Sequence, residues 1–178
     1  MQTPKLDFLC EIRATLAPPL EKGAAHGTSW RIIPITGGTV TGRIEGRVLN
    51  LGADWQTVYP DYAELDTRYA IETHDGALID VRNFGFRHAP PEIMARLIAG
   101  EPVDPSQYYM RTQPRLHSAD PRYAWLNRVV MVGSGERYPD GVRIGICWRG
   151  GTRLFGGGER HVPLESFKPL SEIEGISL

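Results

Sequence analysis

The stretch that decides the fold is Thr36–Trp55, TGGTVTGRIEGRVLNLGADW. Between Val40 and Val48, valine, isoleucine or glycine occupies every even position and threonine, arginine or glutamate every odd one. This period of two is typical of a strand and does not fit a helix. Glycines inside such a strand mark a bend, a bulge or the close approach of another backbone. We therefore expect a sheet that curves enough to close on itself.

The segments before this stretch predict two more strands. Residues 6–16 read as a strand that ends at a pair of prolines, and residues 21–27 read as a loop. Residues 29–35 form a short apolar strand that is predicted to run into a turn at Gly37-Gly38. The chain would then turn back through the glycine-rich strand.

The segments after it predict a meander of antiparallel strands. Residues 63–73 alternate, with Leu65 and Tyr69 on one face and charged residues on the other. Asp75-Gly76 is a strong hairpin signal, because this dipeptide supplies the positive φ values of a tight turn. Residues 77–86 form the return strand.

One helix interrupts the strands, at residues 90–100, where prolines stand at the start and a glycine at the end. It is short enough to cover one end of a barrel. Further strands are predicted at 108–117, 128–133 and 142–148. With about nine or ten strands and one short helix, the expected fold is all-β, a single antiparallel β-barrel. We assign the barrel domain to residues 1–149, and a C-terminal tail of irregular, glycine- and proline-containing sequence to residues 150–178.

The composition is that of a globular protein. The 178 residues are 41% hydrophobic and 23% charged, with a net charge of -1. This balance gives no general attraction to nucleic acid or to an anionic membrane, so neither is expected as a partner. The N-terminus lacks a basic segment followed by an apolar one, and no apolar run is long enough to span a bilayer, so we expect a cytoplasmic location.

The sequence shows no motif for a metal or a nucleotide. Its five histidines do not fall at metal-binding spacings, and no Cys-x-x-Cys occurs. Cys10 and Cys147 are expected to be buried as small apolar residues. The glycine run lies inside a strand and not in a strand-to-helix turn, so it does not predict a phosphate site. We expect no cofactor.

Polar residues on the strands are the candidate site. The predicted turn at Leu51-Gly52-Ala53 places Asp54 beside Trp55. A charged side chain that faces a barrel lumen must be paired or must contact a ligand. The best inward candidates are Arg68, Asn83 and Arg111. The alternatives for each are a structural ion pair with Asp66, Glu72 or Asp80, or plain exposure to solvent. The candidate apolar walls of a pocket are Trp55, Tyr69, Tyr109 and Trp125. The alternative is that these aromatic residues belong to the core and line no pocket.

Several of these segments together resemble the domain-of-unknown-function family 3237, the UPF0311-like proteins. The segments that carry the resemblance are Gly38 to Trp55, Leu65 to Tyr69, Asp75-Gly76, Val81 to Gly85, Tyr108 to Thr112 and Tyr123 to Asn127. The similarity covers roughly Leu6 to Trp148, and the glycine-rich end after Gly150 departs from the pattern. It implies a single-domain antiparallel β-barrel and implies no particular reaction.

The leading hypothesis is an enzyme that needs no metal or nucleotide and acts in the lumen on a small carboxylate, carbonyl or phenolic compound. Arg68 and Arg111 would bind the anionic oxygen and Asn83 would orient it. Asp54 would act as general acid or base if burial raises its pKa, as in an isomerase, lyase or hydrolase. The alternatives are a non-catalytic carrier barrel and a structural or interaction protein whose inward charges are all paired. A barrel edge or the apolar face of the helix could support a homodimer, and nothing in the sequence selects one.

Overall fold

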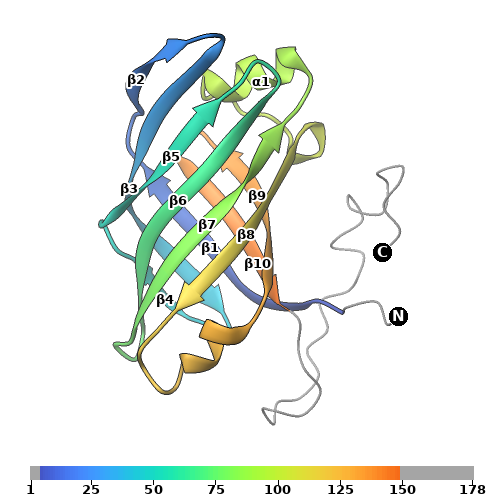
Figure 1. Ribbon diagram of the computed structural model, residues 1–178. Helices are drawn as coiled ribbons and strands as arrows, with labels where there is room; N and C mark the ends of the chain where they lie inside the picture. The colour runs from blue at the N-terminus through green and yellow to red at the C-terminus, as the bar shows by residue number, and fades with distance from the viewer. Residues whose placement is uncertain (1–4, 149–178) are drawn as a thin grey trace.

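The chain forms a closed β-barrel with one α-helix at one end (Figure 1), seen in a computed structural model that describes residues 5–148. The strands are β1 (Asp7–Leu16), β2 (Leu20–Ala25), β3 (Thr28–Gly42), β4 (Gly46–Val48), β5 (Gly52–Val58), β6 (Tyr62–Thr73), β7 (Leu78–His88), β8 (Tyr109–His117), β9 (Met131–Tyr138) and β10 (Gly141–Trp148). The helices are α1 (Pro91–Ile98) and the 3-10 helices η1 (Pro105–Gln107) and η2 (Ala124–Arg128). The predicted tail lies outside the described residues. Within them, no helix has the length and apolar character needed to cross a membrane.

Eight strands close the barrel, and every pairing is antiparallel. The ring runs β1-β10-β9-β8-β7-β6-β5-β3 and returns to β1. Two strands lie outside this ring: β4 also joins β3 to β6, and β2 adds to the free edge of β3. The predicted all-β barrel of about ten strands with one short helix is therefore confirmed.

The long strand β3 closes the barrel. Its first half, Ser29 to Ile35, pairs with β5, and its second half, from Gly37 to Gly42, pairs with β1. The predicted turn at Gly37-Gly38 is wrong, because β3 continues through these residues, with a shift in its register to β1 between Ile35 and Gly37. The glycines mark a close approach of backbones instead: Gly38 has φ +144°, and a Cβ there would lie on the carbonyl oxygen of Arg13.

Further local predictions are wrong, because pairing between strands overrides the local sequence pattern. Residues 20–25 form β2 and not a loop, since pairing with β3 outweighs the weak strand propensity of this segment. The predicted single strand from Val40 to Val48 is wrong: the chain turns at residues 43–45, and β4 folds back to pair with β3 as a hairpin. A second break falls at residues 49–51, between β4 and β5. Asp54 and Trp55 consequently lie inside β5, on opposite faces of the strand.

The interior is divided into two halves. At the end opposite α1, a large apolar core fills the barrel, with the buried side chains of Leu9, Ile12, Ile35, Ile71, Ile79, Leu116, Leu126, Met131 and Ile146 among its members. At the other end, Met94 and Leu97 of α1 pack on Ala63, Leu65 and Met110. The polar residues described below lie between these two apolar clusters, on the α1 side of the large core. This polar layer together with the α1 cluster is called the polar half of the lumen.

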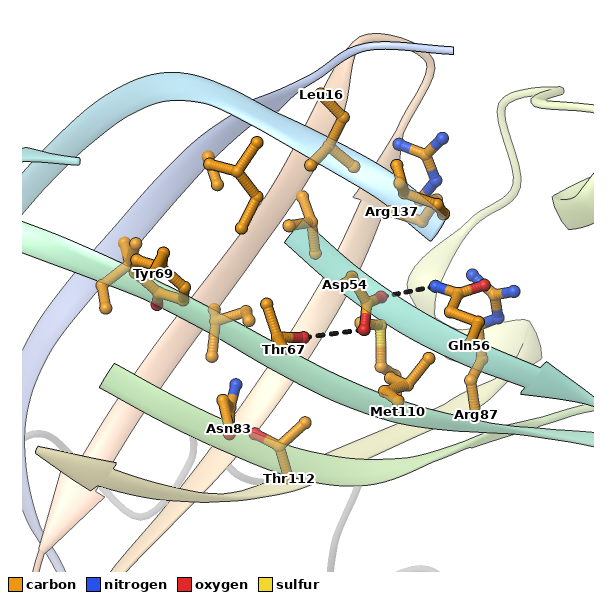
Figure 2. Close-up of a pocket in the computed structure, with 17 residues that line it drawn as sticks. Leu16, Asp54, Gln56, Thr67, Tyr69, Asn83, Arg87, Met110, Thr112 and Arg137 are labelled. Atoms are coloured by element: carbon orange, nitrogen blue, oxygen red, sulfur yellow. Dashed lines mark hydrogen bonds between the residues drawn. The ribbon is translucent and has the colours of Figure 1, made fainter. Parts of the chain in front are cut away.

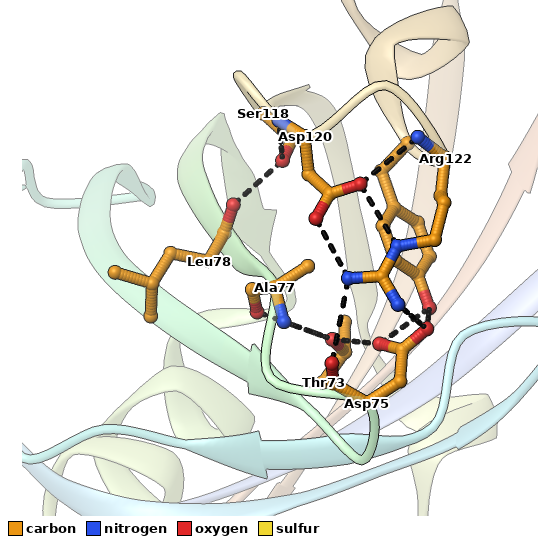
Figure 3. A network of polar contacts seen from close by, with 8 residues as sticks. Thr73, Asp75, Ala77, Leu78, Ser118, Asp120 and Arg122 are labelled. Atoms are coloured by element: carbon orange, nitrogen blue, oxygen red, sulfur yellow. Dashed lines mark hydrogen bonds and ion pairs between the residues drawn. The ribbon is translucent and has the colours of Figure 1, made fainter.

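A polar network ties the loop before η2 to the β6–β7 turn at the end opposite α1 (Figure 3). Arg122 pairs with Asp75 (2.8 Å) and with Asp120 (2.7 Å). Thr73 Oγ1 donates to Asp75 (2.5 Å), and Ser118 Oγ donates to the carbonyl of Leu78 (2.7 Å). This end of the barrel is thus fixed by loop contacts as well as by its core.

The close approach at Gly38 predicts a large cost for a side chain there. Gly38→Ala should lower the free energy of unfolding by about 3 kcal/mol, or the melting temperature by about 6–12 °C. Gly145→Ala is the matched control, because its Cβ would meet nothing nearer than the Ser134 oxygen at 4.0 Å. The control should change stability by less than about 1 kcal/mol. Equal effects in thermal melts would show that β3 does not need glycine at position 38.

Acid should weaken the network at the β6–β7 turn. The hydrogen bond from Thr73 lowers the pKa of Asp75, and Arg122 holds the pKa of Asp120 at about 2. Both folded-state values lie below the usual value of about 3.9. The stabilisation is therefore complete above about pH 4 and is lost as the pH falls toward the folded-state values.

Arg122→Gln tests this pH dependence. Urea denaturation at about pH 5 and about pH 2.5 should show a smaller loss of stability in the variant than in the wild type. Arg115→Gln, on the exposed face of β8, is the control and should behave as the wild type does. If the wild type, Arg122→Gln and Arg115→Gln all lost the same stability between these pH values, acid would destabilise the protein at a site other than this network.

Candidate functional site

The candidate site is a layer of polar side chains on the inward faces of neighbouring strands. In β7 buried and exposed residues alternate from Leu78 to His88, so Asn83 and Arg87 face the lumen and Phe84 and Phe86 face outward. The polar residues that line the lumen are Asp54, Gln56, Thr67, Tyr69, Asn83, Arg87, Thr112 and Arg137 (Figure 2). They come from β5, β6, β7, β8 and β9, so closure of the barrel is what brings them together.

The Asp54 carboxyl is held by two donors. Gln56 Nε2 donates to Oδ2 (2.5 Å), and Thr67 Oγ1 donates to Oδ1 (2.9 Å). Burial raises the pKa of Asp54 above its usual value, and these hydrogen bonds and the charges of Arg87 and Arg31 oppose that rise. The net rise brings the group closer to the proton affinity that a general acid or base needs near neutral pH.

Arg31 fixes the orientation of Gln56. The Nε and Nη2 of this buried arginine on β3 donate to Gln56 Oε1, at 2.9 and 2.7 Å. With its oxygen so occupied, the Gln56 amide must turn its NH₂ group toward Asp54. The relay Arg31–Gln56–Asp54 therefore sets the position of the carboxylate from two strands.

Other polar atoms of the layer have no partner among the described residues. They are Asn83 Nδ2 and Oδ1, Arg87 Nε and Nη2, Tyr69 OH and Thr112 Oγ1. Asn83 and Arg87 are each only 1% exposed. Leaving a buried polar group unpaired costs about 1–3 kcal/mol, so these atoms are available to water or to a ligand.

The space among these residues is small, about 30 Å³. That is room for about two water molecules, and it is far below the roughly 300 Å³ of a typical ligand pocket. A ligand larger than a few atoms would have to displace side chains, of which Met110 is the most adaptable. The small volume agrees with a structural barrel, whereas the unpaired Arg87 and Asn83 disagree with a barrel whose inward charges are all paired.

Three of the predicted site residues meet in this layer: Asp54, Tyr69 and Asn83. Two others lie on the outer surface. Arg68 was expected to face inward, and this prediction is wrong. It precedes the inward-facing Tyr69 in β6 and therefore points to the opposite face of the strand. Its side chain is 52% exposed and forms an ion pair with Asp66 at 3.3 Å. Trp55, next to Asp54 in β5, is likewise outside and 41% exposed.

Arg111 and Tyr109 also point outward, because the alternate residues Met110 and Thr112 are the buried ones of β8. The inward prediction for Arg111 is therefore wrong. Both residues line an outer groove of about 430 Å³, whose other walls include Leu6, Phe84, Phe86 and Val132. Arg111 lies 5.3 Å from the centre of the Tyr109 ring and donates to the Met110 carbonyl (3.0 Å).

Trp125 belongs to the apolar core and not to the polar layer. It lies in η2, with its ring centre 4.8 Å from that of Trp148. Its prediction as a pocket wall in the lumen is not met. Among residues 5–148, the histidine, cysteine, aspartate and glutamate side chains form no group of three or more that could hold a metal ion.

Sequence reasoning missed Gln56, Thr67 and Arg87. The signal was available for each, because each shares the strand face of a residue that was chosen: Gln56 with Asp54, Thr67 with Tyr69, and Arg87 with Asn83.

The fold and the site define a class: small closed antiparallel β-barrels with one apolar and one polar half of the interior. Within this class the chain belongs to the family described as "protein of unknown function (DUF3237)", whose sequence profile matches residues 4–147. A UPF0311 protein of Bradyrhizobium diazoefficiens is 42% identical over 147 residues, which cover 81% of this chain and 97% of that protein. A UPF0311 protein of Clostridium acetobutylicum is 41% identical over 116 residues, covering 64% and 73%.

Solved structures share the fold. A conserved protein of unknown function from Rhodopseudomonas palustris superposes with a TM-score of 0.78 at 39% identity, over 83% of this chain and 99% of that one. A "beta-barrel like protein" from Acinetobacter baumannii gives 0.70 at 40% identity, over 83% and 98%. A protein from Penicillium herquei, described as an enzyme, gives 0.60 at 21% identity over 82% and 97%, a likeness of fold alone.

The raised pKa of Asp54 predicts an unusual pH dependence of stability. Because the folded state holds the proton more tightly than the unfolded chain, this group's contribution to stability falls as the pH rises from about 4 through the raised pKa. Asp54→Asn should remove that fall, and urea denaturation across this range measures it. Asp66→Asn, on the exposed face of β6, should leave the fall in place. If Asp54→Asn showed the same pH dependence of stability as the wild type, the raised pKa of Asp54 would be contradicted.

Proposed function

We propose that the protein binds a small organic molecule in the polar half of the lumen and catalyses a proton transfer on it. The proposal rests on Asp54, a partly buried carboxyl that two donors orient and that shares its lumen layer with the unpaired amide of Asn83. A protein core needs no such arrangement, because burying polar groups without partners lowers stability. The expected substrates are small carbonyl, carboxylate or phenolic compounds.

In this proposal Asp54 exchanges a proton with the substrate, and Asn83 and Tyr69 orient it. Asn83 offers both a donor and an acceptor, and Tyr69 offers a hydroxyl whose partners are not supplied by the described residues. Burial beside Cys10 raises the pKa of the Tyr69 hydroxyl, so that it acts as a neutral donor. Abstraction of a proton next to a carbonyl and its return to another atom would be an isomerase reaction. Lyase and hydrolase reactions suit the same groups.

Arg68 and Trp55 have no part in the lumen reaction in this proposal, because they lie on the outer surface. The roles first assigned to Arg68 and Arg111 pass to the polar groups inside the barrel. The binding layer lies next to the cluster around Met94 and Leu97, so the end that carries α1 is the proposed route for a ligand.

Exchange of substrate hydrogen for deuterium tests the proposal. Mixtures of small ketones, lactones, carboxylic acids and phenols are incubated with the protein in D₂O and followed by proton NMR. The wild type should remove at least one C–H signal or convert one compound, and Asp54→Asn should slow this by about 10²–10⁴-fold. Asp66→Asn is the matched control and should keep the wild-type rate. Equal rates for Asp54→Asn and the wild type would exclude Asp54 as the acid or base.

Non-catalytic binding in the outer groove is the second candidate function. The size of the groove, about 430 Å³, favours it, since ligand pockets occupy about 300–1,000 Å³. Its aromatic walls and Arg111 suit an apolar anion. A compound that binds unchanged, whose affinity falls in Arg111→Met and not in Asp54→Asn, would establish this function in place of the first.

A further inference from the structure

Positive charge exceeds negative charge in the polar half of the lumen. Burial, followed by the neighbouring charges of Arg31 and Arg137, lowers the pKa of Arg87 to about 10, and Asp54 is the carboxylate that opposes this. Glu21, on β2, also acts on Arg31, and Asp140, in the β9–β10 turn, also acts on Arg137. Three arginines thus act on one partly buried carboxyl, that of Asp54.

Two of these arginines have hydrogen-bond acceptors. Arg31 donates to Gln56, and Arg137 Nη1 donates to the carbonyls of Tyr138 (2.6 Å) and Gly141 (2.7 Å). Arg87 differs: it is 1% exposed, and its Nε and Nη2 find no acceptor in residues 5–148. None of the ion pairs in that part of the chain includes it.

The unpaired atoms of Arg87 form one edge of the guanidinium group. Nε and Nη2 carry two nearly parallel N–H bonds, which match the two oxygens of a carboxylate. A single buried charge without a counter-ion is strongly unfavourable, and the cost is removed when an anion binds there. Arg87 lies among the residues that line the lumen cavity (Figure 2), so an anion at this edge would sit inside the barrel.

We propose that the lumen is a site for a monoanionic carboxylate, whose two oxygens accept hydrogen bonds from Nε and Nη2 of Arg87. The carboxylate is favoured over phosphate because a planar carboxylate group is smaller than a tetrahedral phosphate, and the space is only about 30 Å³. This inference rests on the proposed function, of which it names the substrate class.

Titration with sodium acetate tests the site, because acetate is a small monoanionic carboxylate and the cavity is small. In the full-length wild type, acetate should raise the melting temperature and shift the Arg87 Nε–H signal in nitrogen-15 NMR spectra, and equal concentrations of sodium chloride or sodium phosphate should do neither. Arg87→Met should weaken acetate binding at least about tenfold, and Arg87→Lys should give an intermediate loss, since lysine keeps the charge without the fork.

Arg87→Met should itself melt at a higher temperature than the wild type without acetate, because it removes an uncompensated buried charge. Should that variant not fold, Arg87→Lys and the Nε–H signal still decide the question. Arg111→Met is the matched control: this arginine also has a buried Nε without a partner, but it lies in the outer groove. It should bind acetate as the wild type does.

The outcomes separate this inference from the proposed function. Binding lost in Arg111→Met and kept in Arg87→Met would overturn it, as would no response to acetate or an equal response to chloride or phosphate. Asp54→Asn should bind acetate at least as tightly as the wild type, because a neighbouring negative charge is removed. Acetate binding without any turnover would leave the carboxylate site standing and remove the catalytic role of Asp54. Turnover of neutral carbonyl compounds without acetate binding would support the catalytic role of Asp54 and overturn the carboxylate site at Arg87.

Discussion

Closure of the sheet through β3 is the interaction on which the rest of the structure depends. One strand pairs with β5 along its first half and with β1 along its second, and glycine at position 38 lets the backbones of β3 and β1 approach. Only when the ring is closed do residues of β5, β7 and β9 face the same enclosed space. Without it, Asp54, Asn83 and Arg87 would lie on one face of an open sheet, exposed to water.

The closed interior then creates an energetic contrast between its two ends. The apolar end, capped by the loop that carries Arg122, provides the burial that stabilises the fold. The polar end keeps Arg87 and Asn83 away from water without giving them protein partners, which lowers stability. Sites that bind ligands commonly hold polar groups in this way, because the ligand supplies the missing partners. The arrangement at the α1 end has this character, and the apolar end does not.

Much of the fold could be predicted from local patterns. The alternation of β6 and β7, the Asp75-Gly76 turn, and the short helix with proline at its start and glycine at its end all appear in the structure at or within two residues of their expected places. The failures concern how strands pair. Residues 20–25 pair with β3 across the two-residue turn His26-Gly27, whose φ values are both positive, so this hairpin is local and was missed. The pairing with β1 is distant in the sequence, and nothing near Gly37-Gly38 distinguishes a turn from a strand that passes close to β1.

The site was predictable only in part, for reasons of strand geometry. Asn83 and Tyr69 follow from alternation, and the same rule places Arg68 opposite Tyr69 and therefore outside. Charge alone was a poor guide, because an arginine on a strand is as suitable for a surface ion pair as for a lumen. Alternation places Arg87 on the strand face of Asn83, but only the three-dimensional structure shows that it is buried without a partner.

The proton affinity of Asp54 tests the central claim most directly, namely that the polar half of the lumen is a shielded site for chemistry. Carbon-13 NMR of the aspartate carboxyl groups, assigned with Asp54→Asn, measures this pKa as the pH is varied. We expect a pKa for Asp54 above the usual value of about 3.9. A pKa at or below that value would show a carboxylate that is hydrated or fully paired, and would contradict the account.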